Sequence, residues 1–164
     1  NDGEAAMKSG TTLILTGSRS LAKSHARRHW NITGVIHVLN RVQPDIVRVG
    51  DAEGTDALAM AFAMLGLFGF IYEGWCLDGT IRDVRAEVKA VWCTPDEAKA
   101  FAFGQLPLHR NESMVKARLE TPRGAYAGFI DHESTTHGTE HTARHCAGQK
   151  FYGRTFTYPE SFTK

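Results

Sequence analysis

Three short segments of the sequence place glycine, hydroxyl and charged side chains directly after apolar residues. The first is Thr16–Arg19, the second is Gly50–Asp56, and the third is His137–Thr139. Backbone N–H groups in such turns, together with hydroxyl and guanidinium donors, can surround a phosphate group. Because turns that follow neighbouring strands can converge on one ligand, the sequence predicts a shared anion-binding site.

The residues of the first segment each suit a role beside a phosphate. Gly17 would let the backbone approach closely, and the hydroxyl groups of Thr16 and Ser18 would donate hydrogen bonds. The guanidinium of Arg19 could add a charge-assisted, bidentate contact. A tight turn with a surface arginine would need the same residues, and this alternative stays open.

The second segment matches no standard nucleotide-binding loop. It lacks the Gly-Lys-Ser/Thr end of a Walker A loop and the spacing of a GxGxxG fingerprint. Asp51 and Glu53 would repel a phosphate, so these side chains are expected to accept hydrogen bonds from ribose hydroxyls or a base. Asp56 is expected to cap the helix that follows.

Apolar periodicity predicts the elements that position these segments. Strands are expected over 12–16, 46–49, 68–72, 125–130 and 151–157, and helices over 24–42, 56–65, 82–92, 95–103, 109–118 and 139–147. In the first helix, Ile32, Val35, Ile36 and Leu39 are expected to form the buried face. Because strands and helices alternate, the sequence predicts an α/β fold with a mostly parallel five-stranded sheet.

The length of 164 residues suits one domain. We expect that domain to cover 12–158, with a helical insertion over about 73–107. Residues 1–11 are expected to be a leader or a cloning remnant, and 159–164 a tail.

Composition excludes some classes of function. A net charge of +1 provides no field that would steer the protein to nucleic acid, so a nucleic-acid partner is not expected. The longest apolar stretch contains two glycines and suits a buried helix, so no membrane association is expected. The acidic first residues do not resemble a secretory signal, and three cysteines without close spacing favour free thiols and a cytoplasmic location. A Cys76–Cys93 bridge would be an alternative in an exported protein, and homo-oligomerisation stays open.

The order of the short motifs resembles that of a known family, the YspA-like branch of the SLOG superfamily. The motifs are Thr16-Gly17-Ser18-Arg19, Gly50-x-x-x-Gly54-x-Asp56-Ala57-Leu58-Ala59, His109-Arg110-Asn111-x-x-Met114 and Gly138-Thr139. That superfamily also includes the Lonely Guy phosphoribohydrolases and the DNA-processing protein A fold. The resemblance runs from about Thr12 to Tyr158 and is interrupted by the insertion.

The resemblance implies a Rossmann-like three-layer domain that binds a nucleotide or a nucleotide-derived ligand, such as an ADP-ribose-like molecule or a nucleoside phosphate. It suggests a role in sensing or sequestering such molecules, often in conflicts between bacteria and phages. The expected ligand-binding residues, from the turns and from the resemblance together, are Thr16, Gly17, Ser18, Arg19, Gly50, Asp51, Gly54, Thr55, Arg110, Asn111, His137, Gly138 and Thr139. No cofactor is expected to be required.

An enzyme of the Lonely Guy type is the first alternative. It would hydrolyse an N-glycosidic bond of a nucleoside 5′-monophosphate, with Arg110 positioning the phosphate and Glu140 or Glu133 as the catalytic carboxylate. The enzymes of that branch carry Pro-Gly-Gly-x-Gly-Thr, whereas this chain lacks the double glycine and has its acid one position early. Binding without turnover is therefore the preferred hypothesis.

A divalent metal site is the second alternative. His137, His141 and His145 recur every four residues, with His132 and Cys146 nearby. However, the rise of a helix would separate the outer two by about 12 Å, which is too far for one ion. A row of histidines that faces solvent or the ligand is the preferred interpretation, and no metal ligand is assigned.

Overall fold

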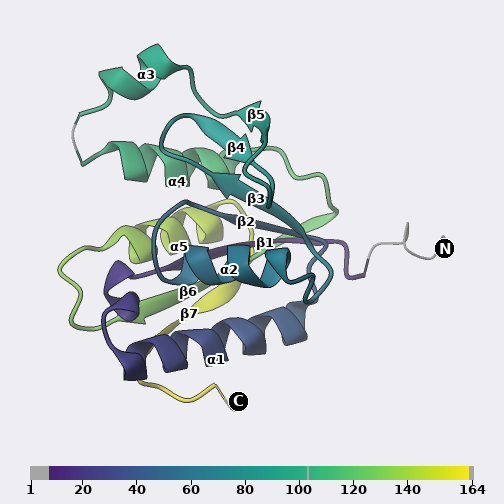
Figure 1. Ribbon diagram of the computed structural model, residues 1–164, viewed down its shortest axis with the longest axis vertical. Coiled ribbons are helices and arrows are strands. Elements are labelled where there is room, and N and C mark those ends of the chain that lie inside the picture. The colour runs from purple at the N-terminus through teal and green to yellow at the C-terminus, as the bar shows by residue number, and fades with distance from the viewer. Residues whose placement is uncertain (1–7, 103, 163–164) are drawn as a thin grey trace.

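A computed structural model describes residues 8–102 and 104–162, which form a seven-stranded sheet with helices on both faces (Figure 1). The strands are β1 (Thr11–Gly17), β2 (Ile46–Val49), β3 (Ile71–Trp75), β4 (Thr80–Arg82), β5 (Val88–Val91), β6 (Arg123–Asp131) and β7 (Tyr152–Tyr158). The helices are α1 (His25–Val42), α2 (Thr55–Met64), α3 (Pro95–Ala100), α4 (Leu106–Lys116) and α5 (Gly138–Gly148), with a short 3₁₀ helix η2 (Arg19–Ala22) after β1.

The sheet confirms the α/β class but not the five-stranded sheet. Its strand order is β5-β4-β3-β2-β1-β6-β7. β1, β2, β3, β6 and β7 pair in parallel, whereas β4 and β5 add an antiparallel hairpin beside β3. The sheet is therefore mixed and has seven strands. The order of its parallel strands is consistent with a Rossmann-like arrangement, in which the chain direction across the sheet reverses beside the first strand.

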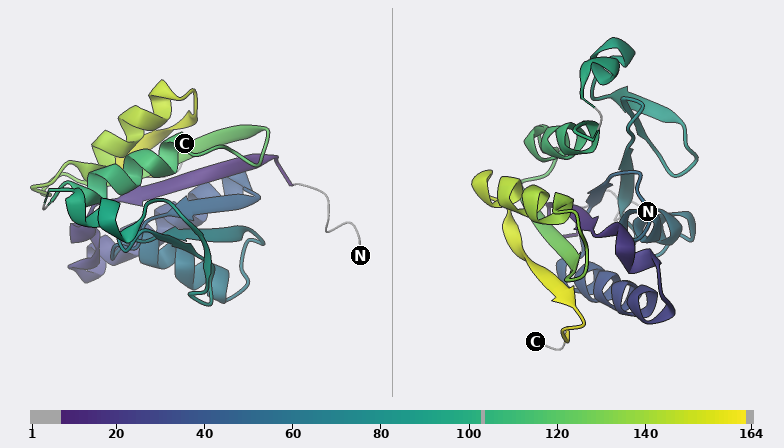
Figure 2. Two further views of the ribbon diagram at one scale, coloured as in Figure 1. Left: turned by 90° about the horizontal axis from the view of Figure 1, so that it is seen from above. Right: turned by 90° about the vertical axis from the view of Figure 1, so that its left-hand side faces the viewer.

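Two apolar cores lie on opposite faces of the sheet, as Figure 2 shows by the separation of the helices into two layers. Successive side chains of a strand point to opposite faces, so in β1 Leu13 and Leu15 join the core under α1 and α2 while Ile14 joins the core under α4 and α5. All three are fully buried. This double burial explains why β1 is an uninterrupted apolar run.

The predicted helix over 82–92 is wrong, because this segment forms the β4–β5 hairpin. The side chain of Asp83 accepts hydrogen bonds from the backbone N–H groups of Arg85 and Glu87, at 2.8 and 3.0 Å. These contacts fold the chain back on itself, and β4 then pairs with the edge of β3. Among its described residues the insertion is helical at α3 and at its last two residues, which begin α4. At α3, Thr94 and Glu97 form a capping box on either side of Pro95, as expected of a helix that begins there. Phe103, the predicted end of this helix, lies outside the described residues.

The start of one strand and the buried face of one helix also differ from the predictions. Phe68 and Gly69 have positive φ angles of 63° and 64°, so the strand predicted over 68–72 begins at Ile71 instead. In α1 the buried face contains Trp30, Val35 and Leu39, whereas Ile32 is 37% exposed. The apolar stripe of α1 is therefore rotated relative to the expected one. The residues after β7 also contribute to the core, because Phe162 stacks near Trp30 at a ring distance of 5.0 Å.

Candidate functional site

A cleft of about 460 Å³ opens beyond the carboxyl ends of β1 and β6. The chain leaves β1 toward α1 on one face and leaves β6 toward α5 on the other, so the two connections part at this point. The cleft is lined by Thr16, Gly17, Ser18, Arg19, Ala52, Asp56, Gly104, Pro107, Leu108, Arg110, Asn111, Thr136, His137, Gly138, Thr139, His141 and Arg144.

The cleft brings together the first and third predicted segments and the Arg110-Asn111 pair. Every predicted residue of Thr16–Arg19 and of His137–Thr139 lines it. The second segment contributes Ala52 and Asp56 instead of the expected residues. Gly50, Asp51, Gly54 and Thr55 are not among the residues that line the cleft: Gly50 and Thr55 are buried, whereas Asp51 is exposed.

Residues of the second segment serve packing. Thr55 is fully buried and its hydroxyl donates to Asn31 Oδ1 at 3.0 Å. A Cβ atom on Gly17 would lie 1.9 Å from Thr55 Oγ1, so only glycine lets β1 approach the start of α2. Gly54 precedes that helix with a φ of 86°, a conformation that favours glycine. Gly17 and Gly54 thus allow the turn after β1 and the turn before α2 to pack against each other.

Arg110 lies in the wall of the cleft and is 3% exposed. Its Nη1 donates to Asp51 Oδ1 at 2.7 Å and to the Trp75 carbonyl at 2.8 Å, and its Nε donates to Asn111 Oδ1 at 2.7 Å. A Cβ atom on Gly50 would lie 2.5 Å from the guanidinium carbon. Arg110 therefore joins α4, β3 and the second turn, and most of its donors are already used inside the protein.

Among the described residues that line the cleft, Asp56 is the only one with a carboxylate side chain. Its Oδ2 accepts a hydrogen bond from the Ala52 N–H at 3.1 Å. Burial raises the pKa of Asp56 from 3.8 to about 6, although Arg110 and the Ala52 N–H favour the ionised form. An acid with a pKa near neutrality in a cleft can exchange a proton with a bound molecule.

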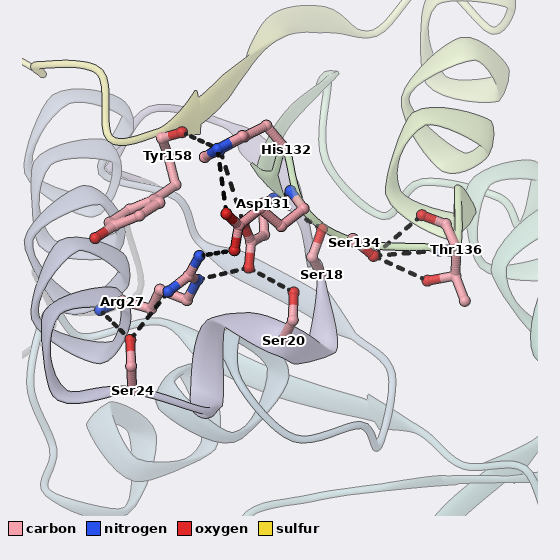
Figure 3. A network of polar contacts seen from close by, with 10 residues as sticks. Ser18, Ser20, Ser24, Arg27, Asp131, His132, Ser134, Thr136 and Tyr158 are labelled. Atoms are coloured by element: carbon pink, nitrogen blue, oxygen red, sulfur yellow. Dashed lines mark hydrogen bonds and ion pairs between the residues drawn. The ribbon is translucent and has the colours of Figure 1, made fainter.

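Ser18 connects the first turn to the end of β6 (Figure 3). The Ser18 N–H donates to the Phe129 carbonyl at 2.9 Å, and its hydroxyl oxygen accepts from the Asp131 N–H at 3.0 Å. Since the Ser18 hydroxyl is an acceptor in that contact, its own proton can point elsewhere. The position of Ser18 in the lining of the cleft makes this proton available to a ligand.

Asp131 is the centre of a network of hydrogen bonds that links the end of β6 to Ser18, Ser20 and Arg27 (Figure 3). Its Oδ2 accepts from Ser20 Oγ and from Arg27 Nε, both at 2.7 Å, and its side chain is 1% exposed. Burial by itself would raise the pKa of Asp131, but the Ser20 and Arg27 donors outweigh it and keep that pKa below its ordinary value. Glu133 pairs with Arg27 at 2.5 Å and does not line the cleft.

The third segment ends at the N-terminus of α5. The first turn of this helix has no side-chain cap. The first backbone hydrogen bond of the helix runs from the His141 N–H to the His137 carbonyl oxygen. The N–H groups of the residues before His141 thus have no partner within the helix. A Cβ atom on Gly138 would meet nothing within 4 Å, so access to them is open.

Glu140 lies in the first turn of α5 but is not among the residues that line the cleft. One of its oxygens is 3.5 Å from His137 Nδ1. The other, Oε1, is buried and has no hydrogen-bond partner among the described residues. Neither Glu140 nor Glu133, the two carboxylates expected for catalysis, thus faces the cleft.

Two arginines give the cleft its free positive charge. Arg19 follows β1 and Arg144 lies in the second half of α5, and both side chains are exposed. Neither guanidinium has a hydrogen bond or ion pair to the described part of the chain. Arg144 was not among the predicted ligand-binding residues. It could have been found from the spacing of Gly138, His141 and Arg144, which places one residue per turn on the same face of a helix.

A second polar group lies between α4 and α5. Glu112 Oε2 is 2.9 Å from His141 Nε2 and 3.6 Å from His145 Nε2. One ligand atom from each of these three residues lies within 4.8 Å of the others, so the group could hold a metal ion. The hydrogen bond from His141 lowers the pKa of Glu112. The histidine row had identified two of the three ligands, and Glu112 was missed because it comes from another helix.

The other residues of the histidine row lie elsewhere. His137 precedes α5 at the cleft, and His132 Nδ1 is 2.9 Å from the Tyr158 carbonyl oxygen. Cys146 lies on the buried face of α5 and is fully buried, which raises the pKa of its thiol to about 12. Cys76, Cys93 and Cys146 are all free thiols.

Comparison of the chain with protein-family models, curated proteins and solved structures finds no match. Within residues 8–102 and 104–162, no helix has both the length and the apolar character needed to cross a bilayer.

Proposed function

We propose that the cleft binds a nucleotide or nucleotide-derived ligand through its phosphate and ribose groups, in a sensing or sequestering role. The observation that carries this proposal is the meeting of the Thr16–Arg19 turn and the α5 N-terminus across one cleft between β1 and β6. This is the position at which open α/β sheets bind ligands. The likeness to the YspA-like branch of the SLOG superfamily in the order of the motifs points to the same class of ligand.

The donors around the cleft suit an anion. The uncapped first turn of α5 supplies backbone N–H groups and the positive end of the helix dipole. Ser18 and Thr16 supply hydroxyl groups, while Arg19 and Arg144 supply guanidinium groups that have no hydrogen-bond or ion-pair partner among the described residues. A phosphate would satisfy these donors together.

The size and shape of the cleft also suit a nucleotide. Its volume of about 460 Å³ falls within the range of sites for small molecules. Pro107 and Leu108, at the start of α4, add an apolar surface to the lining of the cleft. A phosphate at the helix N-terminus would leave this surface for a ribose or a base.

Titration calorimetry with ADP-ribose, AMP and adenosine tests the proposal. ADP-ribose or AMP should bind, and adenosine should bind more weakly because it lacks the phosphate. Arg19→Ala and Arg144→Ala should each weaken phosphate-dependent binding by about 10- to 100-fold, the usual loss for a charge-assisted hydrogen bond. Arg85→Ala, at an exposed position in the β4–β5 turn, is the matched control and should bind as the parent does. Equal affinity of the parent, Arg19→Ala and Arg144→Ala would reject the proposal.

A nucleotide N-glycosidase is the second candidate, and the raised pKa of Asp56 is the observation that favours it. Asp56 replaces Glu140 and Glu133 as the carboxylate that lines the cleft. Incubation with nucleoside monophosphates and with NAD, followed by chromatography for free base, separates the two candidates. Base released by the parent and not by Asp56→Asn would favour the enzyme, and no release would favour binding alone.

A further inference from the structure

We propose that Glu112, His141 and His145 form a binding site for a divalent metal ion of the zinc class. The site lies between α4 and α5 and uses none of the proposed phosphate donors, so it does not depend on the proposed nucleotide ligand, although His141 also lines the cleft. It differs from the histidine row of the sequence, because His137 is not part of it.

The distances between the ligand atoms are close to those of a metal centre. In a tetrahedral zinc site with bonds of about 2.0–2.1 Å, ligand atoms lie about 3.3 Å apart. Glu112 Oε2 is 2.9 Å from His141 Nε2 and 3.6 Å from His145 Nε2, on either side of that value, and the three ligand atoms all lie within 4.8 Å of one another. Small rotations of the side chains would let one ion contact all three atoms.

The helices hold these side chains in place before any ion binds. His141 and His145 are four residues apart on α5 and thus project from the same face, with ring centroids 4.6 Å apart. Glu112 reaches them from α4, which packs directly against α5. The three side chains are between 26 and 31% exposed, so they are partly shielded from water and yet an ion can reach them.

The three side chains converge on one point from two helices. Both imidazole Nε2 atoms approach the same oxygen, Glu112 Oε2. Two nitrogen atoms and one oxygen atom are the ligand set of zinc sites that have three protein ligands and a fourth position for water.

Titration calorimetry with Zn²⁺ alone on the metal-free full chain tests the proposal. The parent should bind one equivalent, and Co²⁺ in its place should give the visible absorption of a tetrahedral site. His145→Ala and Glu112→Gln should each weaken Zn²⁺ binding by more than about tenfold, since changes to groups that only support a ligand already cost 10- to 100-fold. His137→Ala removes an exposed histidine just before the same helix and is the matched control, with an expected change of less than about twofold.

Three results would overturn the proposal: no one-to-one binding of Zn²⁺ by the parent, unchanged affinity in Glu112→Gln, or an equal loss in His137→Ala and His145→Ala. The melting temperatures of all variants in the presence of a chelator show whether each variant folds. Glu112→Gln is nearly isosteric, so it decides the question if His145→Ala does not fold.

Discussion

Replacement of Asp56 by asparagine should change the pH dependence of stability in one defined direction. The Asp56 side chain lies in the cleft wall, where its Oδ2 accepts the Ala52 N–H, and the residue is 9% exposed. Burial raises its pKa from 3.8 to about 6. The native state therefore holds the proton more tightly than the unfolded chain between these two values, and its stability falls as the pH rises through that interval.

The size of the effect follows from the shift. One pKa unit corresponds to about 1.4 kcal/mol, so a rise from 3.8 to about 6 corresponds to a loss of about 3 kcal/mol once the pH is well above 6. Asparagine is neutral at every pH, and its carbonyl oxygen can still accept the Ala52 N–H. Relative to the parent, Asp56→Asn should thus gain up to about 3 kcal/mol between about pH 4 and pH 7.

Urea unfolding of the parent and of Asp56→Asn from about pH 3 to pH 7.5, in buffers without phosphate, measures this difference directly. Asp45→Asn is a control of opposite sign. Burial tends to raise the pKa of Asp45, but hydrogen bonds from the N–H groups of Lys8 and Gly10 outweigh it and lower that pKa, so the contribution of Asp45 is lost as the pH falls below its ordinary value of 3.8. A constant difference between Asp56→Asn and the parent across the whole range would refute the reasoning.

Three other substitutions, with Gly138→Ala as a control, test the frame of the cleft by chemical denaturation. Gly17→Ala should destabilise the protein by about 1–3 kcal/mol or more, because its Cβ would overlap Thr55, whereas Gly138→Ala meets nothing within 4 Å and should change stability little. Asp131→Asn should destabilise the protein by about 2–3 kcal/mol at neutral pH. Because the pKa of Asp131 is lowered, this difference in stability between the parent and the variant should disappear as the pH falls below about 4. A difference that persists at that pH would contradict this account. Arg110→Ala should cost about 3 kcal/mol, since Arg110 is buried and bonded to three elements, and near-parent stability would show that these bonds contribute little.

Periodicity was sufficient to predict the parallel part of the sheet. β1 and β2 are buried along nearly their whole length, and β7 carries aromatic residues at positions 152, 156 and 158. The β4–β5 hairpin could not be predicted in this way, because the spacing of Val84, Val88 and Val91 also fits a helix. What decides the outcome is the Asp83 turn and the free edge of β3, and pairing with a sheet edge is not visible in the local sequence.

The residues that line the cleft were predictable where their place depends on the position of the backbone, and less so where it depends on the surroundings of the side chain. The first and third segments line the cleft because they follow β1 and β6, which are neighbours in the sheet. In contrast, a glycine needed for packing looks the same in sequence as one needed beside a phosphate, and Gly50 makes room for the Arg110 guanidinium. Arg110 in turn looks the same as Arg19, although one is buried and bonded and the other is exposed.

The rotation of α5 about its axis links the two proposed sites. Thr142, Ala143 and Cys146 are buried against the sheet and fix this rotation. Given that rotation, Arg144 faces the cleft and His145 faces α4, while His141 borders both. A helix that turned by one residue would lose the arginine from the cleft and the imidazole from Glu112 together. The buried stripe of α5 is therefore the feature on which both sites depend, although neither site includes Cys146 or Ala143.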